Sequence, residues 1–134
     1  TDIAGLLSFL SQVLKRKTII FLISDFITPP FERQLAVLSK RHELTAIQVH
    51  DPADLELPSC GLVRLEDPET GTIRLIDAAK SEIRRAYRER AEQLHTELRT
   101  VLNRHGAGHL LLRTDQPFIH ELRRFFAAKQ RVAR

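Results

Sequence analysis

The side chain best placed to do chemistry in this sequence is Asp25, which directly follows the mostly apolar run at residues 18–24. A run this apolar and this rich in β-branched residues is typical of a strand buried on both faces, which indicates the centre of a parallel sheet. In open α/β sheets, ligands bind beyond the carboxyl ends of the strands. We therefore expect Asp25 to lie at the ligand-binding edge of such a sheet.

A carboxylate in this position supports three kinds of chemistry. It can hold a divalent cation, accept a phosphoryl group, or cap the backbone amides of the next turn. Hard cations such as Mg²⁺ prefer oxygen ligands, and Ser24 and Thr28 place hydroxyls close by in the sequence. We expect the hydroxyl of Thr1 to lie near them in space, because the helix that Thr1 opens leads directly back into the strand. The residues alone leave the three roles of Asp25 open.

Other kinds of reactive site find little support in the residue pattern. The single Cys60 excludes an intrachain disulfide and a cysteine-based zinc site, and it fits a reducing cytoplasm. His105 and His109 are separated by glycines, so they do not share a helical face as a zinc pair would need. The sequence has neither a glycine-rich phosphate loop between a strand and a helix nor a nucleophile elbow. We therefore expect no cofactor-binding residues and no catalytic residue apart from what Asp25 could provide.

Apolar residues recur with helical and strand-like spacing in alternation along the chain. The expected elements are, in order, a helix at 3–14, a strand at 18–25, a short helix at 29–41, a strand at 44–49, a polar loop at 51–58, a hairpin with strands at 62–65 and 72–76, a helix at 81–104, a strand at 109–113 and a last helix that residues 114–117 start. This order predicts an α/β fold with a mostly parallel sheet, helices on its faces and right-handed crossovers.

Length, composition and charge limit the class of protein. The chain has 134 residues, 43% of them hydrophobic and 28% charged, which suits one globular domain with one core. No apolar stretch approaches the roughly 18 residues of a membrane span, so we expect no membrane contact by this segment. The net charge of +4 permits an acidic partner. Because the arginines are interleaved with glutamates, as on a solvated helix face, we expect no nucleic-acid binding.

Several short motifs are more specific in their order and spacing than each is alone. A helix opens at Thr1-Asp2-Ile3 and closes at Lys15-Arg16-Lys17, and the following strand ends in Ser24-Asp25-Phe26. Further along the chain come Asp51-Pro52 with Glu56-Leu57-Pro58, Gly61-Leu62-Val63 with Asp67-Pro68-Glu69-Thr70-Gly71, and Leu112-Arg113-Thr114-Asp115 before a Phe-rich last helix. In these motifs nearly the whole chain resembles the second half of the bacterial DUF58 family, which carries a von Willebrand factor A-like domain.

The resemblance implies a specific fold. Residues 1–134 would form a single, partial von Willebrand factor A-like domain: three layers, Rossmann-like, with a mostly parallel sheet and a β-hairpin inserted at about 61–77. The first central strand of such a domain has no counterpart here and would lie upstream of residue 1. We therefore expect the chain to be a piece of a longer protein, and the strand at 18–25 to lack one neighbour.

The resemblance also implies a metal-ion-dependent adhesion site. Such a site combines an Asp-x-Ser-x-Ser loop, a Thr on a second loop and an Asp after the next central strand. By position, Thr1 matches that Thr and Asp25 matches that Asp, with Ser24 and Thr28 just outside the ligand set. The serine-bearing loop is absent from this sequence, so Mg²⁺ in the intact protein would take most of its ligands from residues upstream of Thr1.

The function that the resemblance implies is a non-catalytic protein-interaction module in the bacterial cytoplasm, with a protein partner linked to a MoxR-type AAA ATPase. A long apolar strand edge invites pairing with another chain, so we also expect a homo-oligomer formed through the strand at 18–25. The alternative is a Mg²⁺-dependent phosphoacceptor or hydrolase that uses Asp25 as its nucleophile. Asp51 and Asp115, which follow later strands, would then supply further acidic groups.

The incomplete ligand set leads to a prediction about metal affinity. Thr1 and Asp25 are two ligands, one of them neutral, which is too few to hold Mg²⁺ tightly. Calorimetric titration of this chain with Mg²⁺ should therefore detect no binding in the micromolar range. Micromolar binding that Asp25→Ala abolishes would contradict this expectation.

Overall fold

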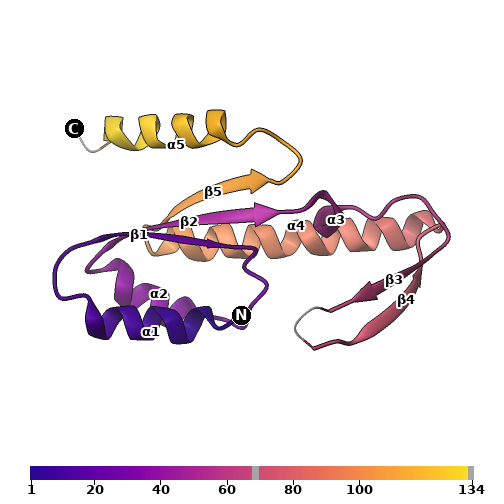
Figure 1. The fold of residues 1–134 in the computed structure, drawn as a ribbon, viewed down its shortest axis with the longest axis horizontal. Helices are drawn as coiled ribbons and strands as arrows, with labels where there is room; N and C mark the ends of the chain where they lie inside the picture. Colours follow the sequence, from indigo (N-terminus) through magenta and orange to yellow (C-terminus); the bar gives the residue numbers. More distant parts are fainter. Residues whose placement is uncertain (68–69, 133–134) are drawn as a thin grey trace. The chain divides into compact units, whose positions relative to one another are not determined.

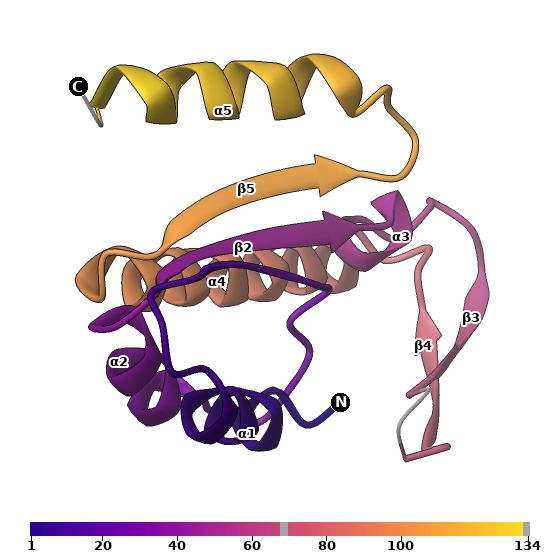
Figure 2. The same ribbon diagram turned by 60° about the vertical axis from the view of Figure 1, so that its left-hand side comes forward.

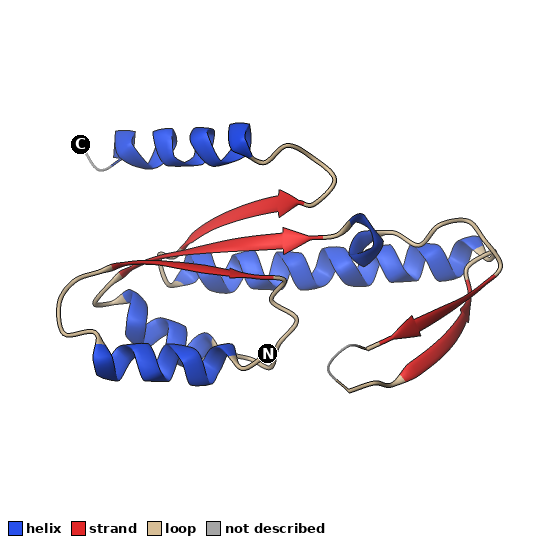
Figure 3. Cartoon of the chain, viewed as in Figure 1, coloured by secondary structure: helices blue, strands red, loops and turns tan. Residues whose placement is uncertain are grey.

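The computed structural model describes residues 1–67 and 70–132, with side chains as far as residue 129. The chain divides into two compact units, residues 1–50 with 98–134 and residues 51–97. The helices and strands along the chain are α1 (Ile3–Val13), β1 (Ile19–Ser24), α2 (Glu32–Ser39), β2 (Glu43–His50), α3 (Pro52–Leu55), β3 (Leu62–Glu66), β4 (Ile73–Asp77), α4 (Ser81–Arg104), β5 (Gly108–Arg113) and α5 (Ile119–Val132) (Figure 3).

The first unit is built on a parallel sheet with the strand order β1-β2-β5 (Figure 1). The register pairs Ile20 with Leu44 and Ala46 with His109. Long crossover connections that contain helices join the parallel strands, as is usual for parallel pairing. The predicted α/β fold with a mostly parallel sheet is therefore confirmed.

The position of β1 corrects one expectation. The family resemblance predicts that the strand at 18–25 lacks one neighbour, and within the described residues β1 does lie at the edge of the sheet, with β2 central. The apolar run at 18–24, however, predicts a central strand buried on both faces. Only alternate residues of β1, Ile20 and Leu22, are buried. β2 is buried on both faces from Leu44 to Gln48, although its sequence is more polar. The prediction of a strand buried on both faces fails for a physical reason. An apolar sequence shows only that a strand can be buried, whereas the elements packed around the strand determine which of its faces are covered.

One face of this sheet carries the core of the first unit. Figure 2 shows α1 and α2 together on that side of the sheet. Leu7 of α1, Leu35 of α2 and Leu102 from the last turn of α4 are completely buried. They pack with buried residues of the two neighbouring strands, which are Ile20, Leu22, Leu44 and Ala46. The 3.6-residue spacing of the helices and the two-residue spacing of the strands thus meet in one cluster.

The opposite face of the sheet is covered by α5, which lies along β5 (Figure 2). Lys129 of α5 donates hydrogen bonds to Glu43 Oε1 and Thr45 Oγ1 at the start of β2, both at 2.8 Å. The bond from Lys129 lowers the pKa of the Glu43 carboxyl below its usual value. A side chain at Gly108 would meet the Phe125 ring at 3.2 Å, so glycine permits this close approach of α5.

The second unit contains the antiparallel pair of β3 and β4, in which Val63 faces Ile76. The hairpin predicted at about 61–77 is therefore present, and the expected turn residues 68 and 69 lie outside the described residues. The loop predicted at 51–58 instead contains α3. The carboxylate of Asp51 accepts from the Ala53 amide, and that of Asp54 accepts from the Asp51 amide, which forms a capping box.

In the part of the chain that the structure describes, no helix has both the length and the apolar character needed to cross a membrane. The prediction that residues 1–134 form a single partial domain stays a prediction.

Candidate functional site

The carboxyl ends of β1, β2 and β5 lie along one edge of the parallel sheet (Figure 1). The register aligns Ser24 with Gln48 and His50 with Arg113. Beyond the last pair, the Thr114 amide continues the ladder by donating to the His50 carbonyl at 2.9 Å. This edge is where the sequence predicts a ligand site, and Asp25 follows β1 there.

The carboxylate of Asp25 is engaged by its own loop. Its Oδ1 accepts a hydrogen bond from the Ile27 amide at 3.1 Å and one from the Ser24 hydroxyl at 3.2 Å. The oxygen of that hydroxyl accepts from the Phe26 amide at 3.1 Å. The carboxylate and the hydroxyl together satisfy two backbone amides of an exposed turn, as Asp and Ser commonly do. This geometry supports the capping role among the three that the sequence leaves open.

Phe26 is a residue of this turn that sequence reasoning missed. Its φ of 61° lies in the left-handed region, which is uncommon for a bulky side chain. The ring is half-buried against the core cluster and lies 6.0 Å from the Phe31 ring, measured between centroids. Glycine and asparagine are the usual residues with a positive φ. A phenylalanine at this position therefore does not predict the left-handed conformation. Aromatic packing and the two capped amides therefore hold an otherwise costly backbone.

The amino terminus lies beside the same loop. The hydroxyl of Thr28 donates a 2.8 Å hydrogen bond to the carbonyl oxygen of Thr1. Asp2 then begins α1, and its side chain accepts from the Gly5 amide at 2.7 Å. The structure thus joins Thr1 to the loop that follows Asp25, and this contact uses the backbone of Thr1 and the hydroxyl of Thr28.

The residues at this edge do not make a magnesium centre on their own. Across residues 1–67 and 70–132, no three His, Cys, Asp or Glu side chains cluster in a way that could hold a metal ion. Asp25 contributes one carboxylate, and Oδ1 of that carboxylate already accepts two hydrogen bonds. Because Mg²⁺ favours several oxygen ligands in near-octahedral geometry, we derive no function through a metal from these residues.

Two further acidic residues that follow strands also have local partners. Asp115 accepts two hydrogen bonds from the Arg113 guanidinium, at 3.0 and 2.9 Å. These bonds hold the pKa of the Asp115 carboxyl below its usual value. Asp51, which follows β2, caps α3. Each of these carboxylates therefore stabilises the segment in which it lies.

The sequence matches a known family. Residues 1–97 match the family described as "Protein of unknown function DUF58". The chain belongs to the DUF58 family. This confirms the family resemblance, whereas its von Willebrand factor A-like part stays a prediction.

Several mycobacterial proteins are similar to this chain along almost its whole length. It is 36% identical over 135 residues to the uncharacterized protein MAV169 of Mycobacterium avium, covering 98% of this chain and 78% of that protein. It is 35% identical to the uncharacterized protein Rv1480 of Mycobacterium tuberculosis H37Rv, covering 98% of this chain and 42% of that protein. No solved structure matches the chain at a significant level. The chain thus corresponds to less than half of its longer relatives, and what the whole proteins do is a matter for proposal.

The conformation of Phe26 gives a prediction in which glycine is the better substitute. Phe26→Gly and Phe26→Ala both remove the packing of the ring, but glycine adopts a positive φ without strain. The glycine variant should therefore be the more stable of the two by about 1 kcal/mol in urea unfolding.

Exposed Phe9, in the interior of α1, offers a matched control. At that position the order should reverse, because glycine is a poorer helix residue than alanine by about 0.5–1 kcal/mol. An alanine variant at Phe26 that equals or exceeds the glycine variant in stability would contradict the assigned role of this turn.

Proposed function

We propose that this chain is a non-catalytic protein-interaction module of a DUF58 protein, and that it binds its partner through the free edge and outer face of β1. The observation that carries the proposal is the exposure of alternate apolar residues there. Ile19, Phe21 and Ile23 are 60%, 47% and 65% exposed. The Phe126 ring of α5 contacts Phe21 edge-on at 5.5 Å. In the described residues β1 pairs with β2 alone, so one side of β1 is free to accept another strand.

This surface suits strand addition. An edge strand presents unpaired backbone amides and carbonyls that another strand can satisfy. Covering the exposed parts of Ile19, Phe21 and Ile23 adds about 1–2 kcal/mol for each side chain. Backbone pairing and apolar burial would then act on the same three residues, which favours a partner that supplies an extended, apolar strand.

A second copy of this chain is such a partner. If two β1 strands meet antiparallel around a two-fold axis at Phe21, Ile19 of each copy faces Ile23 of the other. The same register brings Lys17, just before the strand, opposite Asp25, just after it. Lys17 and Asp25 are both exposed. The apolar face and the charges at the strand ends are therefore complementary to those of an identical chain.

In the longer DUF58 proteins, we propose that this module acts in the bacterial cytoplasm and that it has a protein partner linked to a MoxR-type AAA ATPase. The exposed, free Cys60 is compatible with a reducing compartment. The engagement of Asp25 by its own loop supports a structural carboxylate. For this reason we favour the interaction module over a phosphoacceptor that uses Asp25 as its nucleophile.

A charge-exchange cycle tests the proposed pairing. Lys17→Glu or Asp25→Lys alone places like charges together at both ends of the paired strands, and each should weaken self-association about tenfold. The double variant restores opposite charges and should recover most of the lost affinity. Sedimentation velocity over a range of concentrations measures the dimer dissociation constant of each protein.

Lys40→Glu provides a matched control for Lys17→Glu, because Lys40 is an exposed lysine at the end of α2 and the two substitutions change the net charge by the same amount. It should leave the dissociation constant unchanged, and far-ultraviolet circular dichroism checks that every variant is folded. A wild-type chain that stays monomeric at high concentration would contradict the proposal, as would a double variant that associates no better than the single ones.

A further inference from the structure

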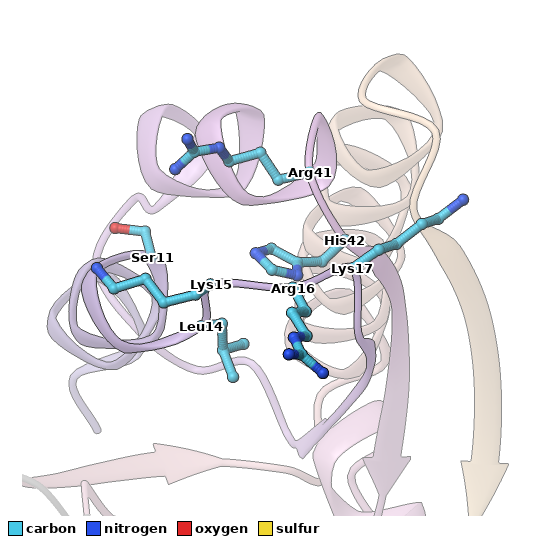
Figure 4. Close-up of a pocket in the computed structure, with 7 residues that line it drawn as sticks. All are labelled: Ser11, Leu14, Lys15, Arg16, Lys17, Arg41 and His42. Carbon is cyan, nitrogen blue, oxygen red and sulfur yellow. The ribbon is translucent and has the colours of Figure 1, made fainter.

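A second feature lies at the amino ends of the parallel strands, where β1 and β2 begin. The end of α1, the segment leading into β1 and the segment between α2 and β2 enclose a pocket of about 200 Å³ (Figure 4). The residues that line it are Ser11, Leu14, Lys15, Arg16, Lys17, Arg41 and His42. All of them belong to the first unit, and four of the seven are lysine or arginine.

His42 is the unusual member of this set. Its side chain is only 5% exposed, and both ring nitrogens are buried without a hydrogen-bond partner. Figure 4 shows the ring pointing from the start of β2 toward the end of α1, into the space between the two segments. Buried polar atoms are nearly always hydrogen-bonded in proteins. We therefore expect the ring of His42 to bind a polar partner in this pocket.

The charges around the ring indicate the sign of that partner. The pocket lining contains no acidic side chain. Basic residues at the end of a helix often serve the exposed carbonyls there, and Lys15 does so by donating to the Gln12 carbonyl at 2.7 Å. Arg16 and Arg41 form no ion pair within residues 1–67 and 70–132, and Lys17 points away from the ring in Figure 4. Figure 4 shows the guanidinium groups of Arg16 and Arg41 on opposite sides of the ring. Each would therefore turn toward the pocket to reach a shared anion.

We propose that this pocket binds a phosphate-type oxyanion, with Arg16, Arg41 and a ring N–H of His42 as its donors. Guanidinium groups match the oxygens of phosphate in geometry and charge. The volume of about 200 Å³ lies below the roughly 300–1,000 Å³ of pockets for drug-sized ligands. The pocket therefore suits the phosphate group itself, either as the free ion or as the terminal group of a phosphomonoester.

Titration with inorganic phosphate at constant ionic strength, followed by the NMR signals of the histidine rings and arginine side chains, tests this proposal. The His42 and Arg41 signals should shift together and saturate. Arg41→Gln should weaken binding at least tenfold, whereas Arg33→Gln, which changes an exposed arginine on α2 outside this pocket, should leave it unchanged. A parallel titration with phosphoserine separates the two sources, because tighter binding than that of inorganic phosphate assigns the pocket to a phosphomonoester.

Absence of saturable shifts with both ligands would overturn the proposal, as would equal losses in the Arg41 and Arg33 variants. His42→Leu supplies a second readout, since it replaces the unpaired ring by an apolar side chain. This variant should lose phosphate binding while its Tm without phosphate stays equal to that of wild type or rises. A His42→Leu protein that still binds phosphate with wild-type affinity would rule out the ring as a donor.

Discussion

The burial of β2 between two parallel neighbours is the constraint on which the first unit depends. Its Leu44 and Ala46 join the helical core on one face, whereas Thr45 accepts a hydrogen bond from Lys129 of α5 on the other. Gln48, also buried, pairs with His109 of β5 at 3.0 Å. Because the buried side chains of Thr45 and Gln48 are hydrogen-bonded and both faces of β2 are covered from Leu44 to Gln48, β2 fixes the register of β1 and β5 and therefore the residues that meet at each end of the strands.

That arrangement gives the carboxyl ends and the amino ends of the parallel strands different chemistry. At the carboxyl ends of the strands, the Asp25 carboxylate accepts from the Ile27 amide and the Asp115 carboxylate accepts from the Arg113 guanidinium. Both carboxylates therefore stabilise the loops in which they lie. At the amino ends of the strands, Arg16 and Arg41 line the same pocket as the buried imidazole of His42. Between these two ends, β1 exposes an apolar side. We therefore assign association to the side of β1 and anion binding to the pocket where β1 and β2 begin.

Local features of this fold could be predicted from the sequence, whereas features that depend on tertiary neighbours could not. The periodicity of α4 and the alternation of β3 and β4 are local signals, and these three elements lie where the sequence predicts them. The edge position of β1 depends on which strands lie beside it, so the family resemblance predicts it and the apolar pattern of the strand does not. The positive φ of Phe26 and the burial of His42 likewise depend on packing by distant residues. Of the candidate site, sequence reasoning found the position of Asp25 but left its capping contacts open.

Disulfide trapping between two copies of β1 tests the central claim most directly. In a Cys60→Ser background, Phe21→Cys should form a covalent dimer under mild oxidation, because the two-fold axis brings these side chains opposite each other. Ile19→Cys and Ile23→Cys should cross-link when mixed and not when each is alone. A Phe21→Cys chain that cross-links no faster than Val37→Cys, at an exposed position on α2, would contradict the account.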